Sequence, residues 1–296
     1  MMRRAAFFAS ALALAGCVAA QPAPVVSTPS AVAPASEARA PEPPGSMQWL
    51  YGSAEGAAAS VQTYRALQAF VEAAVRRRPD SSVVLTEGTT LAQATREPCG
   101  AKPFAVVLDA DETAIQNQGL EYALAVRGVT SDRALLNRWQ EQPRSAAPAM
   151  PGAVEALNAI RELGVTVIFN TNRDSPTAAA TRATLEQAGV GPAEHLKTLF
   201  LRGDVDGKSG KDGRRWHIAR SYCVVAMAGD QMGDFTDLLN ERGLSPRERR
   251  RLATSGSVGA LWGNGWFLLS NPVYGPGVRG SIDEVFEPEN RWDGER

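Results

Sequence analysis

A short apolar run that ends in two carboxylates constrains the fold of this chain more than any other feature. Residues 104–108 (Phe-Ala-Val-Val-Leu) contain no polar side chain, and Asp109 and Asp111 follow them directly. Because every position is apolar, we expect a strand that is buried on both faces, as in a parallel sheet. Ligands of such sheets bind beyond the carboxyl ends of the strands. Asp109 and Asp111 are therefore predicted at the mouth of a crevice, although aspartates also follow strands in ordinary polar turns.

The pattern of a strand followed by a helix recurs along the chain. Apolar runs predict further strands at residues 165–170, 198–201 and 223–228. Helical patterns open at Pro151-Gly152, after Lys211, and at Ser175, which is expected to be an N-cap before Pro176. This alternation predicts an α/β fold in which helices flank both faces of a parallel sheet.

The segment before the first strand is predicted to begin with a structural helix. Apolar residues recur at helical spacing between Ala57 and Ala74, and Arg78-Pro79 ends the pattern. Residues 82–85 are expected to be extended, and residues 87–96 to be helical.

The segments that follow the first and the last predicted strands are additions to the sheet. Residues 114–150 contain two helix-like patches, so we expect a small helical cap insertion that overhangs the crevice. The aromatic tail after Trp262 is expected to pack against the core, because exposed aromatic side chains are unfavourable. The basic run at residues 247–251 is expected to be a solvated helix face.

The first 45 residues are predicted to serve export and tethering. Residues 1–16 form a basic and apolar signal peptide, too short to span a bilayer, and Leu-Ala-Gly-Cys at its end resembles a bacterial lipobox. The resemblance implies cleavage before Cys17 and lipid attached to it, with an ordinary secretory signal as the alternative. Residues 17–45, rich in Pro, Ala and Val, are expected to form a disordered tether before a folded domain at 46–296. Val18 favours the outer membrane, so we expect an exported lipoprotein of the outer membrane or periplasm of a Gram-negative bacterium.

The two other cysteines are predicted to form a disulfide. Pairing is allowed in an oxidising compartment, where an exported protein would reside. Cys99 and Cys223 each lie just ahead of a predicted strand that ends in carboxylates. If those strands are neighbours, both cysteines lie near the same edge of the sheet.

The composition narrows the possible chemistry. Lys plus Arg is 31 and Asp plus Glu is 32, which gives a net charge of −1 and no basic excess for binding a nucleic acid polymer. His195 and His217 are the only histidines. Two are too few for a site built on several histidine ligands, so hydrolytic chemistry must rest mainly on carboxylates.

Reactive side chains follow several of the predicted strands. In chain order, the set is Asp109, Asp111, Thr171, either Lys208 or Lys211, Asp230 and Asp234. Carboxylates at neighbouring strand ends form a hard oxygen site that suits Mg²⁺. A hydroxyl and backbone N–H groups at a helix start can hold phosphate oxygens, and a lysine adds positive charge. Together these groups predict phosphoryl transfer.

This order of residues resembles that of the haloacid dehalogenase (HAD) superfamily of phosphohydrolases. Within it, the chain is similar to the class C acid phosphatases, a lipoprotein family of bacterial 5′-nucleotidases, over about residues 47–274. Further matches are Met47-Gln48-Trp49, Ser53-Ala54-Glu55, Asn117, Trp139, Pro151-Gly152, Thr171-Asn172-Arg173 and Asn271-Pro272-Val273-Tyr274-Gly275. The resemblance implies a HAD-like Rossmannoid sheet with a small cap and additions at both ends.

The resemblance also implies catalytic roles. Asp109 attacks phosphorus and forms an aspartyl-phosphate. Asp111 protonates the leaving oxygen and then deprotonates the water that releases phosphate. Thr171 holds phosphoryl oxygens, and a lysine pairs with the phosphate. We favour Lys211 over Lys208, because Lys211 lies at a predicted helix start.

Metal and substrate ligands follow from the same resemblance. The Mg²⁺ ligands implied are Asp109, Asp230, Asp234 and the backbone carbonyl of Asp111. The substrate-binding residues implied are Asn172, Arg173 and Tyr274. Tyr122, Trp139 and Tyr274 could each stack on a nucleobase or simply pack, and Tyr274 is the best candidate.

The chain departs from the family at three places. Ala110 stands where leucine is usual, residues 116–119 differ from the usual Asn-Ser-Pro-Tyr, and residues 276–279 replace a Trp-Glu pair. The last two segments lie where the leaving group would bind. We therefore expect the chemistry to be kept, while the choice of leaving group is specific to this chain.

Three functions are compatible with these motifs. The first is an Mg²⁺-dependent acid phosphatase that hydrolyses small phosphomonoesters such as nucleoside 5′-monophosphates. A homodimer of such an enzyme would be unsurprising. The second is a non-catalytic surface lipoprotein that uses a HAD fold as a binding module. The third, a phosphoryl-aspartate receiver domain, fits poorly because such domains are shorter and lack Gly-Asp-x-x-x-Asp.

Overall fold

The computed structural model describes residues 42–143, 146–241, 243–292 and 294. They belong to one compact unit, Pro41–Arg296. The predicted signal peptide (1–16), the predicted lipidation site Cys17 and most of the predicted tether lie outside the described residues. Within the described part of the chain, no helix has both the length and the apolar character that crossing a membrane requires.

A five-stranded parallel sheet forms the centre of this unit. Its order is β5 (Leu199–Arg202), β4 (Thr166–Asp174), β3 (Phe104–Leu108), β6 (Cys223–Gly229) and β7 (Trp266–Leu268). The four predicted strands are confirmed. β7 was not predicted, because only three residues form it within a turn-rich tail. Trp266 fixes this edge strand by donating a hydrogen bond from Nε1 to the carbonyl oxygen of Val83 (2.9 Å).

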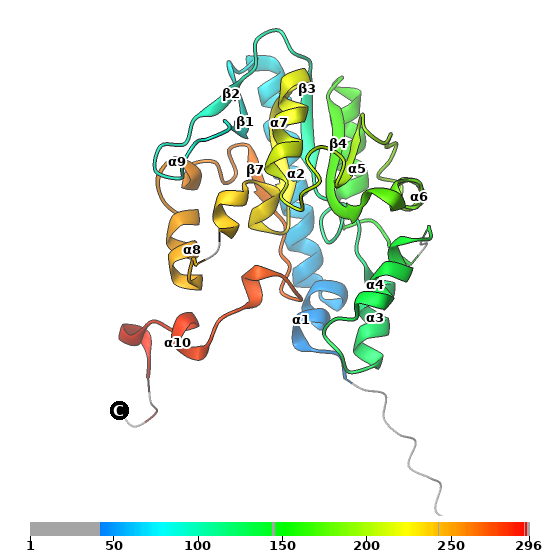
Figure 1. Ribbon diagram of the computed structural model, residues 1–296, viewed down its shortest axis with the longest axis vertical. Coiled ribbons are helices and arrows are strands. Elements are labelled where there is room, and N and C mark those ends of the chain that lie inside the picture. Colours follow the sequence, from blue (N-terminus) through cyan, green and yellow to red (C-terminus); the bar gives the residue numbers. More distant parts are fainter. Residues whose placement is uncertain (1–41, 144–145, 242, 293, 295–296) are drawn as a thin grey trace, which may run out of the picture. The chain divides into compact units, whose positions relative to one another are not determined.

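Both faces of the sheet are covered, as the apolar run predicts. Val106 and Leu108 of β3 pack into one core layer with α2 (Ala54–Arg77), α5 (Ala153–Glu162) and the end of α6 (Ala178–Gln187). Ala105 and Val107 point into a second layer with α7 (Asp212–Ser221) and β1 (Ser81–Leu85). In Figure 1, α7 lies in front of the strands and α2 behind them. The predicted α/β architecture is confirmed.

Helix α2 confirms the amphipathic pattern at the start of the folded part. Tyr64, Leu67 and Val71 are buried on one face. The Ser53 side chain caps the helix by accepting a hydrogen bond from the backbone N–H of Gly56 (2.9 Å). Arg78, in the left-handed conformation, ends it. Two short elements precede α2: α1 (Gly45–Met47) and a π-helix, η1 (Gln48–Gly52).

Two local predictions were wrong. Residues 87–96 are not a helix but a turn leading to β2 (Arg96–Pro98), which pairs antiparallel with β1. Thr89 stabilises this turn by donating to the carbonyl oxygen of Gln93 (2.8 Å) and accepting from the Thr95 N–H (2.9 Å), bonds that compete with a helix. Ser175 is not an N-cap: its hydroxyl donates to Asp204 Oδ1 (2.6 Å). A 3₁₀ turn, η2 (Ser175–Thr177), therefore leads into α6.

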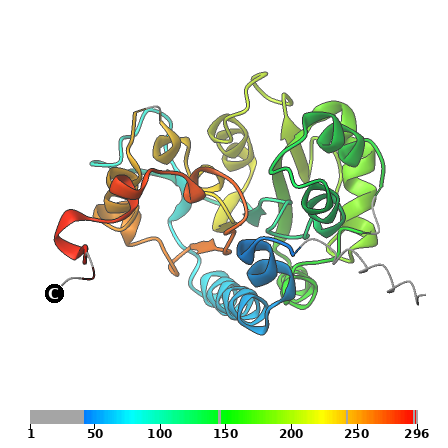
Figure 2. The same cartoon turned by 90° about the horizontal axis from the view of Figure 1, so that it is seen from below.

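The predicted insertion contains two helices, α3 (Gln118–Val126) and α4 (Arg133–Gln140). The C-terminal part adds short elements: η3 (Met232–Asp234), η4 (Asp237–Asn240), α8 (Pro246–Ala253), α9 (Gly256–Gly259), η5 (Pro276–Val278), α10 (Ile282–Val285) and η6 (Pro288–Asn290). The basic run lies on α8, where Arg247, Arg250 and Arg251 are exposed, as predicted. Seen from below in Figure 2, the insertion helices and the tail lie on opposite sides of the sheet.

The structure contains the predicted disulfide. Cys99 and Cys223 are bonded, with their Cα atoms 4.6 Å apart. Cys223 begins β6 opposite Phe104, the first residue of β3. The cross-link therefore joins the entrance of β3 to the start of β6.

Removing this cross-link is expected to destabilise the domain. The disulfide links residues 124 apart, and the closure of a loop of that size restricts the unfolded chain. Replacing both cysteines by alanine should lower the free energy of unfolding by about 2–5 kcal/mol, measured by urea denaturation. A reductant should shift the wild-type midpoint and leave the variant unchanged. Equal midpoints for the oxidised wild type and the variant would contradict this role.

Candidate active site

The strand order places a crevice next to β3. From β3, the sheet continues through β4 and β5 on one side and through β6 and β7 on the other. Parallel sheets bind ligands at such a switch in strand order. Asp109 follows β3 and Asp230 follows β6, and the Asp109 N–H donates to the carbonyl oxygen of Ala228 (3.0 Å). The two aspartates are thus held side by side.

Three buried carboxylates meet at this position. One oxygen from each of Asp109, Asp230 and Asp234 lies within 4.8 Å of the others. Asp234 returns to the strand end because η3 turns immediately after β6, and its Oδ2 accepts from the Gln231 N–H (2.8 Å). A Cβ at Gly229 would overlap the Asp234 side chain, so only glycine fits there.

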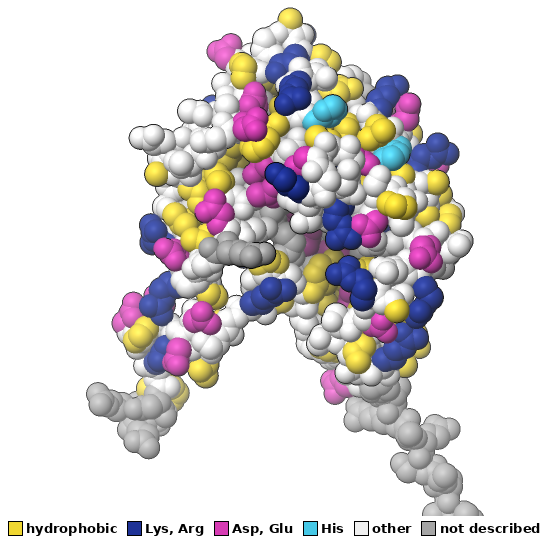
Figure 3. All heavy atoms as spheres, viewed as in Figure 1, with side chains coloured by type: hydrophobic (Ala, Val, Ile, Leu, Met, Phe, Trp, Pro, Cys, Tyr) yellow, Lys and Arg dark blue, Asp and Glu magenta, His cyan; other side chains and the backbone are white. Residues whose placement is uncertain are grey.

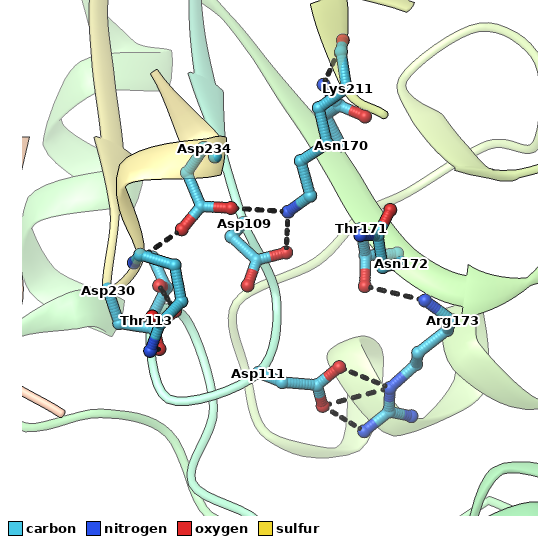
Figure 4. A network of polar contacts seen from close by, with 12 residues as sticks. Asp109, Asp111, Thr113, Asn170, Thr171, Asn172, Arg173, Lys211, Asp230 and Asp234 are labelled. Atoms are coloured by element: carbon cyan, nitrogen blue, oxygen red, sulfur yellow. Dashed lines mark hydrogen bonds and ion pairs between the residues drawn. The ribbon is translucent and has the colours of Figure 1, made fainter. Parts of the chain in front are cut away.

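Lys211 completes the cluster. Its Nζ lies 2.5 Å from Asp109 Oδ1 and 2.6 Å from Asp234 Oδ1 (Figure 4). The lysine stands at the start of α7, and the Asn170 side chain donates to its carbonyl oxygen (3.4 Å). Lys208 is exposed on the preceding loop. Of the two candidate lysines, the structure brings Lys211 to the carboxylates.

The electrostatics of the cluster favour an additional cation. Burial raises the pKa of Asp109 well above its usual value, although the Lys211 charge opposes this. Burial, with the negative charge of Asp234, raises the pKa of Asp230 to about 7. Three close carboxylates face one ammonium group, so the cluster lacks positive charge. Carboxylate oxygens are the donors that hard divalent cations prefer, and Asp109, Asp230 and Asp234 could hold one.

Asp111 lies beside the cluster with separate partners. Arg173 donates to it from Nη2 (2.7 Å) and Nε (3.0 Å), and Asn117 donates from Nδ2 (2.8 Å). Burial alone would raise the pKa of Asp111, but the charge and hydrogen bonds of Arg173 outweigh it and lower the pKa. The side chain of Asp111 is therefore not part of the carboxylate cluster. Its predicted contribution to a metal site would come from the backbone carbonyl.

The end of β4 supplies the other predicted residues. Thr171 is fully buried, and its Oγ1 accepts a hydrogen bond from the Arg173 N–H (3.2 Å). Arg173 is only 1% exposed, and its guanidinium is engaged with Asp111. Asn172 does face the cavity, and its Oδ1 accepts from Arg214 Nη2 (2.5 Å). Arg214 also donates to the carbonyl oxygen of Thr171 and so fixes this part of β4.

The predicted tail residue Tyr274 is tied to the cluster through Asn271. The Asn271 side chain donates to Asp230 Oδ2 (2.8 Å) and accepts from the N–H groups of Val273 (2.9 Å) and Tyr274 (3.3 Å). Gln231 donates to Asp230 Oδ2 (2.9 Å) and to the carbonyl oxygen of Tyr274 (3.3 Å). The tail is thereby anchored to a carboxylate of the cluster.

A cavity of about 910 Å³ opens above these groups. The cluster and Asp111 form its floor, and the insertion and the tail form its walls. The wall residues include Leu120, Leu124, Leu136, Trp139, Tyr274 and Arg279. Figure 3 shows the molecule hollowed between the insertion helices and the tail. Tyr122, also considered for stacking, is 72% exposed and lies outside this cavity.

Comparison with known proteins agrees with this geometry. Residues 53–277 match the family model described as HAD superfamily, subfamily IIIB (acid phosphatase). The chain belongs to this family. It is therefore a phosphomonoester hydrolase with a HAD-like fold, as predicted.

Similar solved structures confirm the fold. The class C acid phosphatase from Bacillus anthracis is 24% identical, with a TM-score of 0.61 over 78% of this chain and 84% of that chain. The structure of the class C acid phosphatase from Bacillus anthracis with tungstate bound is 23% identical, with the same TM-score and coverage. A search of curated proteins found no match.

Sequence reasoning assigned no role in this hydrolase to Glu112, Gln231 or Arg214. Glu112 directly follows Asp109 and Asp111 in the same motif. The sequence alone does not distinguish its role from the roles of these two aspartates. Arg214 is buried in α7, where Ile218 and Ala219 are the only buried apolar residues, so apolar periodicity does not mark Arg214 as inward-facing. Asn117 and Asn271 were noted only as matches to the family.

Loss of the cluster lysine is expected to impair phosphomonoester hydrolysis. Lys211→Met removes the single ammonium group among three carboxylates, so kcat should fall about 100- to 1,000-fold, measured with p-nitrophenyl phosphate. Lys208→Met is the matched control, because Lys208 is exposed on the same loop, and it should keep wild-type kcat. Equal losses in the two variants would contradict the assignment.

Proposed function

We propose that this chain is an Mg²⁺-dependent acid phosphatase that works through an aspartyl-phosphate. The observation that carries the proposal is the separation of two aspartates at one strand end. Asp109 lies within the carboxylate–lysine cluster, whereas Asp111 lies apart from it and is paired with Arg173. Each carboxylate is thus beside a different positive charge, Asp109 beside the Lys211 ammonium and Asp111 beside the Arg173 guanidinium, so the two can take separate roles.

The side chains then divide the reaction between them. Asp109 attacks phosphorus, while Lys211 neutralises charge on the phosphoryl oxygens. Asp111 gives its proton to the leaving oxygen and later takes one from the attacking water. Asp109, Asp230, Asp234 and the backbone carbonyl of Asp111 would hold Mg²⁺, which would supply positive charge to the phosphate. Thr171 and backbone N–H groups after β4 complete the phosphate site.

The cavity supports small aromatic phosphomonoesters as substrates. Trp139 from the insertion and Tyr274 from the tail both line the cavity, and flat rings stack well on such side chains. Nucleoside 5′-monophosphates combine a flat base with a phosphate at a suitable distance. The oxyanion tungstate in the Bacillus anthracis structure is consistent with a site for phosphate-like groups.

We also propose that the protein is exported and anchored to a membrane by lipid. The sequence before residue 42 supports export as a lipoprotein anchored through Cys17 in the outer membrane. The Cys99–Cys223 disulfide supports an oxidising compartment. A homodimer is compatible with this setting.

Replacing the nucleophile is expected to abolish turnover. Asp109→Asn should lower kcat at least about 1,000-fold toward p-nitrophenyl phosphate, and EDTA should inactivate the wild type until Mg²⁺ is restored. Asp283→Asn, on the exposed α10 far along the chain, is the control and should be unaffected. Retained activity in Asp109→Asn would exclude the proposed nucleophile. An inactive wild type that still binds phosphate esters would favour the binding module instead.

Arg173 is expected to set the acidic working range. It lowers the pKa of Asp111, so Asp111 keeps its proton only at acidic pH, and kcat should fall as the pH rises. Arg173→Gln removes the guanidinium charge, which raises that pKa and should move the alkaline limb of the kcat–pH profile to higher pH. Arg202→Gln, at the edge of the sheet, serves as the control. An unmoved limb in Arg173→Gln would contradict this assignment.

A further inference from the structure

Glu112 is a buried carboxylate with a strained backbone next to the catalytic aspartates. It is fully buried, and its φ of 50° lies in the left-handed region that side chains other than glycine rarely adopt. Such conformations persist only where the surroundings hold the residue in place. The contacts of Glu112 show what holds it.

Both carboxylate oxygens of Glu112 accept two hydrogen bonds each. Oε1 accepts from the Tyr51 hydroxyl (3.1 Å) and from the Asn117 backbone N–H (2.7 Å). Oε2 accepts from Asn117 Nδ2 (3.1 Å) and from the Tyr274 hydroxyl. The donors come from η1, from the loop before α3 and from the tail. One side chain therefore joins three segments that are distant in the sequence.

Asn117 extends this junction to the acid and to the insertion. Its Nδ2 also donates to Asp111 Oδ1 (2.8 Å), and its Oδ1 accepts from Trp139 Nε1 (2.8 Å). A Cβ at Gly119 would lie 2.8 Å from the Trp139 ring. The glycine in the divergent segment 116–119 therefore leaves the space that the ring occupies. Trp139 and Asp111 are thus bonded to the same amide.

The junction lies behind the cavity rather than in it. Tyr274, Trp139 and Asn117 line the cavity, whereas Glu112 does not. The hydroxyl of Tyr274 donates to Glu112, which lies outside the cavity lining, and the indole N–H of Trp139 donates to Asn117. The two aromatic walls are consequently fixed relative to Asp111 by polar contacts at their rear.

We propose that Glu112 is a positioning residue that sets the specificity of this phosphatase for flat, aromatic leaving groups. The inference rests on the proposed function, because it assumes that the leaving group lies between Trp139 and Tyr274. Glu112 fixes Tyr274 directly and Trp139 through Asn117. Its four hydrogen bonds go to Tyr51, Asn117 and Tyr274, and none goes to the phosphate site built from Asp109, Lys211, Asp230 and Asp234.

The two hydrogen bonds from Asn117 require an acceptor at each oxygen of the Glu112 carboxyl group. In Glu112→Gln, the new NH₂ group must replace either Oε1 or Oε2. In the first case it faces the Asn117 N–H, and in the second it faces Asn117 Nδ2. Neither group can accept a hydrogen bond, so in both orientations the glutamine NH₂ faces another N–H donor. Tyr274→Phe is the milder variant, because it keeps the ring and removes only its bond to Glu112.

The test compares two substrates in which the phosphate leaves from the 5-hydroxyl of a ribose. Adenosine 5′-monophosphate and ribose 5-phosphate differ by the presence of the base, so the ratio of their kcat/KM values measures recognition of the base. Glu112→Gln and Tyr274→Phe should each lower this ratio about tenfold, mainly through a higher KM for the nucleotide. The double variant should lose little more than either single one. Tyr122→Phe, exposed and outside the cavity, is the control.

The outcomes separate the inference from the proposed function. A wild-type ratio well above one supports nucleotide recognition, and an unchanged ratio in Tyr274→Phe then overturns the role of Glu112, even if Glu112→Gln fails to fold. Equal losses on both substrates also overturn it, because they indicate a general structural role. A wild type that hydrolyses neither substrate contradicts the proposed function, and a wild-type ratio near one contradicts base recognition itself.

Discussion

The repulsion among Asp109, Asp230 and Asp234 is the constraint on which the rest of the site depends. Three buried carboxylates with one oxygen each within 4.8 Å would separate unless the scaffold and a cation held them. Lys211 provides one charge, and the parallel sheet provides rigidity. Asn271, Gln231 and Thr113 add hydrogen bonds to the oxygens of Asp230. Asn271 also accepts hydrogen bonds from the backbone of the tail. The same side chain therefore links the tail wall of the cavity to a carboxylate of its floor.

Charge also separates the roles of the two strand-end aspartates. Asp109 is paired with an ammonium group and surrounded by like charge, whereas Asp111 is paired with a guanidinium and an amide. Two carboxylates that are two residues apart therefore differ in pKa because their partners come from different elements, α7 for one and β4 for the other. This division permits nucleophilic and acid–base chemistry at one strand end.

The class of reaction could be predicted from the sequence, but the contacts that hold the site residues in place could not. Apolar runs buried on both faces mark strands clearly, so the positions of Asp109, Thr171 and Asp230 at strand ends followed from the pattern. Lys211 was favoured over Lys208 because it stands at a predicted helix start, and its contacts with Asp109 and Asp234 agree with that choice. Glu112 depends on contacts with Tyr51 and Tyr274, which are far apart in the chain, and no local periodicity reports such contacts.

The Cys99–Cys223 cross-link has a further consequence for the site. It lies at the entrance of β3 and β6, the strands whose opposite ends carry Asp109 and Asp230. A slip of one residue between these strands would turn alternate side chains to the wrong face and separate the two aspartates. The covalent bond prevents this slip from the end remote from the cation. The strands that carry Asp109 and Asp230 are therefore held together at both ends, by the disulfide at one end and by the hydrogen bond from the Asp109 N–H to the Ala228 carbonyl oxygen at the other.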